Sequence, residues 1–158
     1  MTKVLVIGSG GREDAIGWKL SQSPQVEDLY FAPGNGGTWS LGENVDIQAT
    51  DIPHLLDFAK AKAIDLTVVG PEDPLAKDIA SSFRRAGLRI FGPTAAAAEI
   101  ESTKAFAKAI TRTEMIPTAA SQSFSSHAEA LEYVHRQGAP IVVKANGLAA
   151  GKGVFVCM

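Results

Sequence analysis

The chain has 158 residues, enough for one ordinary domain or for one small domain plus part of another, and its hydrophobic fraction of 46% allows a sizeable core. Its formal net charge is −2 and its basic residues are scattered, which argues against nucleic acid or an anionic membrane as the main partner. It has no apolar run near the ~20 residues of a membrane span, no signal-peptide pattern in MTKVLVIGSGG and a single cysteine, which excludes an internal disulfide, so we expect a cytoplasmic protein.

The first part of the chain alternates strand-like and helix-like segments. Short apolar runs typical of buried parallel strands are TKVLVIG (2–8), EDLYFA (27–32), DLTVVG (65–70) and LRIFG (88–92), with VDI (45–47) as a short additional strand. Helices are expected after the first glycine loop, after an Asp51 cap, and after an Asp73 cap with Pro74 first and Gly87 as the stop. This alternation predicts an α/β fold over residues 1–92, an open parallel sheet doubly wound with helices on both faces.

A second unit is expected to begin at residue 93. The segment TAAAAEIESTKAFAKAITRTEM predicts a helix broken near Ser102, and HAEALEYVHRQG predicts a helix that ends at Gly138. PIVVKA (140–145) and GVFVCM (153–158) predict strands that pair antiparallel, because the connection between them is too short for a parallel crossover. The sequence therefore predicts that residues 93–158 are the incomplete start of another domain.

The segment GSGGRE, Gly8 to Glu13, lies between the first strand and the first helix. Glycines allow a tight turn there, and the helix N-terminus offers free N–H groups and the positive end of its dipole to an anion. The dinucleotide pattern GxGxxG fails, because Glu13 stands at the third glycine and no acidic residue ends the second strand. We favour a phosphate-bearing substrate with Arg12 as a donor. A purely structural turn and a dinucleotide-dependent oxidoreductase stay open as alternatives.

Two further loops are expected at the same edge of the sheet. PGNGG (33–37) follows the second strand, and GPED (70–73) follows the DLTVV strand. Ligands of open parallel sheets collect outside the carboxyl ends of the strands, so these loops should form one pocket with the first. Glu72 is a candidate acceptor for sugar hydroxyls or an amine, or else a solvated carboxylate in a capping turn.

NGLAAGKGV is a second glycine-rich loop, and it is not a Walker P-loop. The spacing from Gly147 to Gly151 is one residue short, Gly153 replaces the hydroxyl residue, and a strand rather than a helix follows. Its N–H groups, with Lys152 at the tip and Lys144 on the preceding strand, could hold a triphosphate. The alternative is a flexible surface hairpin with solvated lysines.

The remaining candidate residues have weaker support. His54, His127 and His135 lie in helical segments without a metal-ligand pattern, so no metal site is predicted in this chain. Lys104 and Lys108 have the spacing of an ordinary solvated helix face. No nucleophile–base arrangement or carboxylate pair stands out, so the catalytic residues are unknown.

The chain resembles the phosphoribosylamine–glycine ligase (glycinamide ribonucleotide synthetase) family of the ATP-grasp superfamily in seven segments: VLVIGSGGRE, WKLSQSP, APGN, VVGPEDPLA, FGPTAAAAEIESTKAFAK, IPTA and APIVVKANGLAAGKGV. The resemblance implies a pre-ATP-grasp, Rossmann-like domain at residues 1–92 and a truncated ATP-grasp domain at 93–158. It also implies a reaction of purine biosynthesis. ATP phosphorylates the carboxylate of glycine, the amine of phosphoribosylamine attacks the acyl phosphate, and ADP and phosphate leave.

The resemblance assigns two sets of site residues. Binding of the phosphoribosyl substrate falls to Gly10, Gly11, Arg12, Glu13, Asn35 and Glu72. Binding of ATP falls to Lys104, Lys144, Gly147, Gly151, Lys152 and Gly153. Mg²⁺ is implied as well, with its ligands expected beyond the end of this chain. The implied partners are the small molecules phosphoribosylamine, glycine and ATP, with no nucleic acid and no membrane.

The sequence departs from the family pattern at two positions. Asp14 replaces a histidine of GREHA, and Asn146 replaces the aspartate of KADGLAAGKGV. A carboxylate at position 14 should weaken anion binding if it points at the phosphate. Family members continue past Met158, so we expect these 158 residues to be inactive alone. A shortened, non-catalytic paralogue that binds nucleotide or sugar phosphate is the alternative.

Overall fold

The computed structural model describes residues 2–149 and 152–158. The chain forms two compact units, Met1–Ala98 and Glu99–Met158. The residues of helix α5 (Ala95–Ser102) lie on both sides of this division in the sequence. The predicted domain boundary between residues 92 and 93 stays a prediction.

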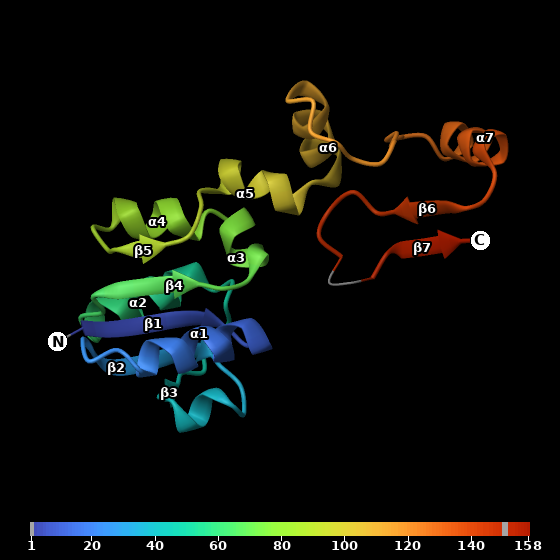
Figure 1. The fold of residues 1–158 in the computed structure, drawn as a ribbon. Coiled ribbons are helices and arrows are strands. Elements are labelled where there is room, and N and C mark those ends of the chain that lie inside the picture. The colour runs from blue at the N-terminus through green and yellow to red at the C-terminus, as the bar shows by residue number, and fades with distance from the viewer. Residues whose placement is uncertain (1, 150–151) are drawn as a thin grey trace. The chain divides into compact units, whose positions relative to one another are not determined.

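The first unit contains a five-stranded sheet with the order β3-β2-β1-β4-β5 (Figure 1). All of its strand pairs are parallel, and the strands are β1 (Thr2–Gly8), β2 (Val26–Pro33), β3 (Glu43–Asn44), β4 (Leu66–Val69) and β5 (Ile90–Phe91). The connecting helices are α1 (Gly11–Ser21), the 3-10 helix η1 (Thr38–Ser40), α2 (Ile52–Ala61), α3 (Glu72–Ala76) and α4 (Ile79–Arg85). The predicted open parallel α/β sheet is confirmed.

Alternate residues of β1 belong to two separate clusters of buried side chains. Leu5 and Ile7 lie in a cluster with Leu55 of α2 and Phe83 of α4. Val4 and Val6 lie in the other cluster, against which two apolar residues of α1 pack. Because side chains alternate across a strand, the two clusters are the two faces of the sheet, each covered by helices. This burial makes the central strands a rigid support for the loops at their carboxyl ends.

Of three local predictions for this unit, one is confirmed and two are wrong. Asp51 caps α2 as predicted, because its side chain accepts a hydrogen bond from the backbone N–H of His54. The strand expected at 45–47 is wrong, since the two paired residues are those of β3. The single helix expected after Asp73 is also wrong. Asp78 has a φ of 63°, in the left-handed region, and this breaks the segment into α3 and α4.

The second unit follows the predicted order of elements. A break at Thr103 separates α5 from α6 (Lys104–Thr113), which confirms the break expected near Ser102. Helix α7 (His127–Gln137) ends at Gly138, as predicted. Strands β6 (Ile141–Lys144) and β7 (Val154–Cys157) form the predicted antiparallel hairpin. None of the helices that the structure describes in either unit is long and apolar enough to cross a membrane.

Candidate functional site

The first glycine loop joins β1 to α1, and its backbone leaves no room for larger residues. Gly8 has a φ of 128°, which L side chains rarely adopt. A Cβ atom at Gly8 would lie 2.6 Å from the side chain of Glu13 and 2.8 Å from the ring of Pro71. Gly10 precedes the first turn of α1, where backbone N–H groups have no acceptor inside the helix. The loop is therefore tight and presents N–H donors.

Glu13 supports this loop from beneath. Its side chain is only 3% exposed, and its Oε2 accepts a hydrogen bond of 2.6 Å from the backbone N–H of Gly10. An added Cβ at Gly70 would clash with its carboxylate, so the end of β4 also closes over it. The other oxygen, Oε1, makes no hydrogen bond to a described residue, but it lies 3.2 Å from Nε of Arg12 as an ion pair. Glu13 thus joins the loop to its neighbouring strand.

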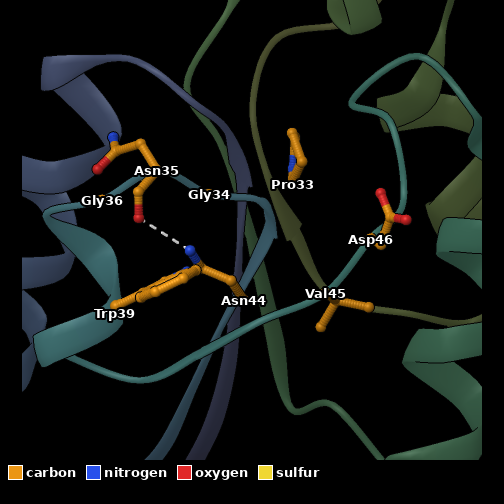
Figure 2. Close-up of a pocket in the computed structure, with 8 residues that line it drawn as sticks. All are labelled: Pro33, Gly34, Asn35, Gly36, Trp39, Asn44, Val45 and Asp46. Carbon is orange, nitrogen blue, oxygen red and sulfur yellow. Dashed lines mark hydrogen bonds between the residues drawn. The ribbon is translucent and has the colours of Figure 1, made fainter.

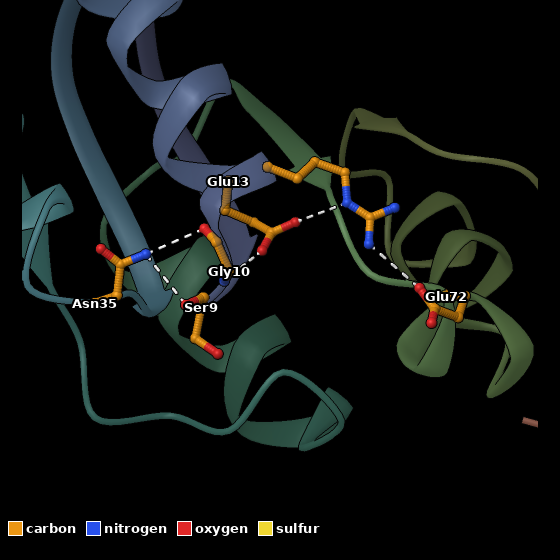
Figure 3. Close-up of polar contacts among 6 residues, drawn as sticks. Ser9, Gly10, Glu13, Asn35 and Glu72 are labelled. Atoms are coloured by element: carbon orange, nitrogen blue, oxygen red, sulfur yellow. Dashed lines mark hydrogen bonds and ion pairs between the residues drawn. The ribbon is translucent and has the colours of Figure 1, made fainter. Parts of the chain in front are cut away.

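Arg12 forms ion pairs with two carboxylates, those of Glu13 and Glu72, which are labelled in Figure 3. Its Nε faces Glu13, and its Nη2 donates to Oε2 of Glu72 at 3.3 Å. Glu72 opens α3, so this contact connects the loop after β1 with the loop after β4. The side chain of Arg12 is 54% exposed, and a guanidinium has five N–H donors, so donors remain for a ligand.

Asn35 connects a third loop, the one after β2, to the loop after β1. Its Nδ2 donates to the carbonyl oxygens of Ser9 and Gly10, both at 3.1 Å (Figure 3). Its Oδ1 accepts from the backbone N–H of Gly37 at 2.7 Å, which folds the turn after β2. The carboxyl ends of β1, β2 and β4 therefore meet at one edge of the sheet. All six residues predicted for the phosphoribosyl substrate lie in the loops at this edge or in the first turns of α1 and α3 that follow them.

Asp14 lies on the side of α1 that faces the turn after β2. An added Cβ at Gly37 would clash with Oδ1 of Asp14, so this carboxylate sits directly over that glycine. It also lines a shallow depression together with Trp18 and Leu41. The carboxylate is thus directed at Gly37, whereas Arg12 faces Glu72.

A separate open pocket of about 450 Å³ lies beside the end of β2 (Figure 2). Its lining residues are Pro33, Gly34, Asn35, Gly36, Trp39, Asn44, Val45 and Asp46. Asn35 is the only one of the six predicted substrate residues in this lining. Its carbonyl oxygen accepts a hydrogen bond of 2.8 Å from Nδ2 of Asn44 here.

In the second unit, the structure brings Lys104 to the start of the second glycine loop. Nζ of Lys104, the first residue of α6, donates to the carbonyl oxygen of Gly147 at 2.8 Å. The base of the loop is closed by a bond of 2.8 Å from the N–H of Ala145 to the carbonyl oxygen of Gly153. Lys144 is exposed at the end of β6, and Gly151 lies outside the described residues.

Lys152 continues this loop on its other side. Its backbone N–H donates to the carbonyl oxygen of Ala149 at 2.7 Å, and Lys152 as a whole is exposed. Gly153, which follows, has a φ of 68°, so a side chain at that position would be strained. The chain thus bends at Gly153, directly before β7.

Two residues have roles that the sequence did not reveal. The side-chain oxygen of Asn146 accepts a hydrogen bond of 2.7 Å from the N–H of Ala105, 41 residues away. Lys108 is half-buried, and its Nζ has partners that its helix-face spacing did not indicate, since it donates to Oγ1 of Thr118 at 2.6 Å and to the carbonyl oxygen of Ala119 at 2.9 Å. No local pattern could show either contact. Among residues 2–149 and 152–158, no group of three or more His, Cys, Asp or Glu residues is arranged to hold a metal ion.

Comparison with known proteins connects these two glycine loops with one family. Two family models match the chain. The model described as "Phosphoribosylglycinamide synthetase, N domain" matches residues 2–101, and the model described as "Phosphoribosylglycinamide synthetase, ATP-grasp (A) domain" matches residues 102–158. The chain is 58% identical over 158 residues to a phosphoribosylamine–glycine ligase of Escherichia coli K12. It is 57% identical over 158 residues to that of Vibrio parahaemolyticus. It covers 37% of the length of each of these relatives.

Solved structures agree with this match. A phosphoribosylamine–glycine ligase from Thermotoga maritima aligns with a TM-score of 0.72 and 30% identity, over 98% of this chain and 36% of that one. An N5-carboxyaminoimidazole ribonucleotide synthetase from the same organism aligns with a TM-score of 0.70 and 19% identity, over 99% of this chain and 41% of that one, and shares the fold. With one family model on each side of residue 101 and close identity along the whole length, the chain belongs to the phosphoribosylglycinamide synthetase family.

Proposed function

We propose that this chain is the N-terminal part of an ATP-dependent ligase of de novo purine biosynthesis. The reaction joins glycine to 5-phosphoribosylamine and yields glycinamide ribonucleotide, ADP and phosphate. The observation that carries the proposal is the position of Arg12, an exposed guanidinium beside the N–H groups of a glycine loop at the meeting point of three strand ends. This arrangement suits the phosphate of a sugar phosphate.

The first unit supplies the site for the phosphoribosyl substrate. Gly10 and Gly11 lead into α1, whose first N–H groups are free to donate to a phosphate oxygen. Arg12 adds charged donors. The Arg12–Glu72 pair is partly exposed, and such pairs contribute only about 0–1 kcal/mol. A phosphate can therefore displace Glu72 from Arg12 at little cost and leave its carboxylate to accept from ribose hydroxyls or the amine.

Glu13 and Asn35 act in this site through the loops. The Glu13 carboxylate holds the N–H of Gly10, and the Asn35 amide holds the carbonyl oxygens of Ser9 and Gly10. These contacts fix the loop before a ligand arrives, so binding orders few additional groups. The Asp14 carboxylate lies against Gly37, in the turn after β2.

The second unit supplies part of the ATP site. Lys104 already contacts the loop at Gly147, and Lys144, Lys152 and Gly153 lie along the same hairpin. Ammonium groups and free N–H groups are the donors that a triphosphate needs. Gly151 is included on the resemblance to the family alone. The phosphoryl acceptor is the glycine carboxylate, whose acyl phosphate then reacts with the amine of phosphoribosylamine.

The other predicted properties remain part of this proposal. Mg²⁺ is expected to accompany ATP, but the described residues contain no cluster suited to hold it, so no role in this chain is assigned to a metal. The proposed partners are the small-molecule substrates rather than nucleic acid or a membrane, and the proposed location is the cytoplasm.

Calorimetric titration of the 158-residue chain with ribose 5-phosphate tests the sugar-phosphate site. Binding is expected for the parent chain, and Arg12→Ala should weaken it by about tenfold or more, because a charged hydrogen bond contributes about 1.5–3 kcal/mol. Arg84→Ala is the matched control, since Arg84 bonds to the carbonyl oxygen of Gly92 and lies outside the three loops. Tight binding of NAD in place of ribose 5-phosphate would instead favour an oxidoreductase.

Titration with ATP tests the second site separately. ATP binding that Lys104→Met abolishes would support the assignment, whereas equal binding by parent and variant would contradict it. Ligase activity of the longer protein, assayed as phosphate release that depends on glycine and phosphoribosylamine, separates the ligase from a non-catalytic binding paralogue. Binding of both ligands without turnover would favour the paralogue.

A further inference from the structure

Asn146 binds the first turn of helix α6 through two hydrogen bonds. Its backbone carbonyl oxygen accepts from the N–H of Lys104 at 3.1 Å, and its side-chain Oδ1 accepts from the N–H of Ala105 at 2.7 Å. The first N–H groups of a helix have no acceptor within the helix. Asn146 therefore satisfies two adjacent donors of α6 from a segment 41 residues further along the chain.

The residue that normally caps a helix start makes no such bond in α6. Thr103 occupies the N-cap position, yet its side chain makes no capping hydrogen bond. Threonine and asparagine are both preferred cap residues, because their side-chain oxygens accept from the second or third N–H of a helix. Ala105 is the second residue of α6, so Oδ1 of Asn146 occupies the place of the missing cap.

The same segment also holds the side chain of Lys104. Gly147 follows Asn146 directly, and its carbonyl oxygen accepts from Nζ of Lys104 at 2.8 Å. An ammonium group has three donors, so this bond orients Nζ and leaves two donors for phosphate oxygens. Backbone, side chain and neighbouring carbonyl thus join the start of α6 to the first residues of the glycine loop.

We propose that Asn146 is a positioning residue for the triphosphate site. It caps α6 from the loop and thereby fixes Lys104 relative to the glycine loop, without itself touching the nucleotide. The inference rests on the proposed binding of ATP by this unit. Without Oδ1 of Asn146, the N–H of Ala105 loses its acceptor, and only the bonds from the N–H of Lys104 to Asn146 and from Nζ of Lys104 to Gly147 still join the helix start to the loop, so the two separate more readily. Binding a triphosphate must then order both.

Three variants separate this role from a general effect on the helix. Asn146→Ala removes the acceptor oxygen. Asn146→Asp keeps an acceptor and adds a negative charge at a helix N-terminus, which is favourable for the helix, so it is the rescue variant. Thr103→Ala is the matched control, because it changes the cap residue whose side chain makes no capping bond.

The experiment measures, in the 158-residue chain, the Kd for ATP and for inorganic tripolyphosphate, together with hydrogen exchange of the Ala105 amide. Asn146→Ala should raise both Kd values and speed Ala105 exchange by about fivefold to tenfold, the scale of a lost helix cap. Asn146→Asp should stay within about threefold of the parent chain on all three measures. Thr103→Ala should match the parent chain.

Each contrary result overturns a distinct statement. Equal affinity of parent and Asn146→Ala, with measurable binding by the parent, overturns the positioning role and leaves the ATP site intact. Equal losses in Thr103→Ala and Asn146→Ala also overturn it, since the effect would then belong to any change at the helix start. A parent chain that binds neither ligand overturns the proposed ATP site. In that case hydrogen exchange still tests the cap. An Ala105 amide that exchanges equally fast in Asn146→Ala and in the parent chain would overturn the capping bond, and faster exchange in Asn146→Ala would support it.

Discussion

The two glycine loops of this chain have similar compositions but rest on different supports. The loop after β1 follows a strand whose residues Val4, Leu5, Val6 and Ile7 are almost fully buried, and the buried Glu13 holds it from below. The loop after β6 leads into β7, on which Phe155 and Val156 are largely exposed. In the described part of the second unit, α6, α7 and both strands contain no buried residue.

This difference indicates how each loop can bind a ligand. A loop on a buried sheet is fixed in advance, so its N–H donors are in place before the phosphate arrives. A loop on an exposed hairpin depends on a few hydrogen bonds, those of Asn146 and Lys104, and has a low cost of local opening. In this chain we therefore expect the loop after β1 to keep its conformation when a ligand binds, and the loop after β6 to move.

The largest expected effect comes from paired aromatic truncations in the two units. Phe83→Ala should lower the free energy of unfolding by about 3–5 kcal/mol, because Phe83 is 0% exposed and its loss leaves a cavity. Phe155→Ala should change it by less than about 0.5 kcal/mol, because Phe155 is 68% exposed. Urea unfolding, followed by the fluorescence of Trp18 and Trp39 and by far-UV circular dichroism, measures both. A large loss from Phe155→Ala would show that the hairpin is buried in solution.

A smaller effect tests the support beneath the first loop. Glu13→Ala should lower the free energy of unfolding by about 2 kcal/mol, because it leaves the N–H of Gly10 without its charged acceptor. Glu72→Gln is the control, since it removes only an exposed ion pair with Arg12 and should cost less than about 1 kcal/mol. Similar losses in the two variants in thermal unfolding would mean that the Glu13 carboxylate is hydrated rather than buried.

Two buried threonines of the first unit differ in whether their side-chain hydroxyl group has a hydrogen-bond partner. Oγ1 of Thr38 accepts from the N–H of Asn35 at 2.8 Å and donates toward Asn44 at 2.7 Å, so Thr38→Val should cost about 2 kcal/mol. Oγ1 of Thr67 has no hydrogen-bond partner among the described residues, so the nearly isosteric Thr67→Val should stabilise the protein by about 1 kcal/mol. Chemical denaturation measures both changes. Destabilisation by Thr67→Val would reveal a partner for that hydroxyl.

The smallest expected effect concerns pH and the exposed cap of α2. The hydrogen bond to Asp51 raises the pKa of His54 above its ordinary 6.5, and the same bond lowers the pKa of Asp51 below 3.8. The stabilisation by charged His54 is therefore complete below pH 6.5 and is lost as the pH rises through the raised pKa. The stabilisation by Asp51 is present above pH 3.8 and is lost as the pH falls through the lowered pKa.

Asp51→Asn tests this pH dependence, because it keeps a capping oxygen and removes the charge. The pKa of His54, followed by NMR, should fall in this variant, and the decline of the melting temperature above pH 6.5 should flatten. An unchanged pKa would show that the pair does not persist in solution. The caps of the two helices differ in their origin. Helix α2 is capped by Asp51, the residue directly before it, whereas α6 is capped by Asn146 from a distant loop.

The sequence predicted most of the fold because the relevant patterns are local. The continuous apolar run of β1 and the spacing of the helices between strands indicated a parallel sheet, and Asp51 marked a helix start that the structure confirms. The errors were local as well. Nothing in the apolar spacing of residues 73–87 shows that Asp78 adopts a left-handed conformation and divides the helix.

The sequence alone determined where most of the strands, the two glycine loops and most of the helices lie, because apolar period, glycine and capping residues act over a few positions. Only the tertiary structure decided what supports each loop, because the partners are far apart in the chain. Arg12 meets Glu72 across 60 residues, and Ala105 meets Asn146 across 41. Burial of Glu13 likewise depends on Gly70, which reaches it only when β4 pairs with β1. Contacts of this kind have no local signature, since they form only once the chain has folded.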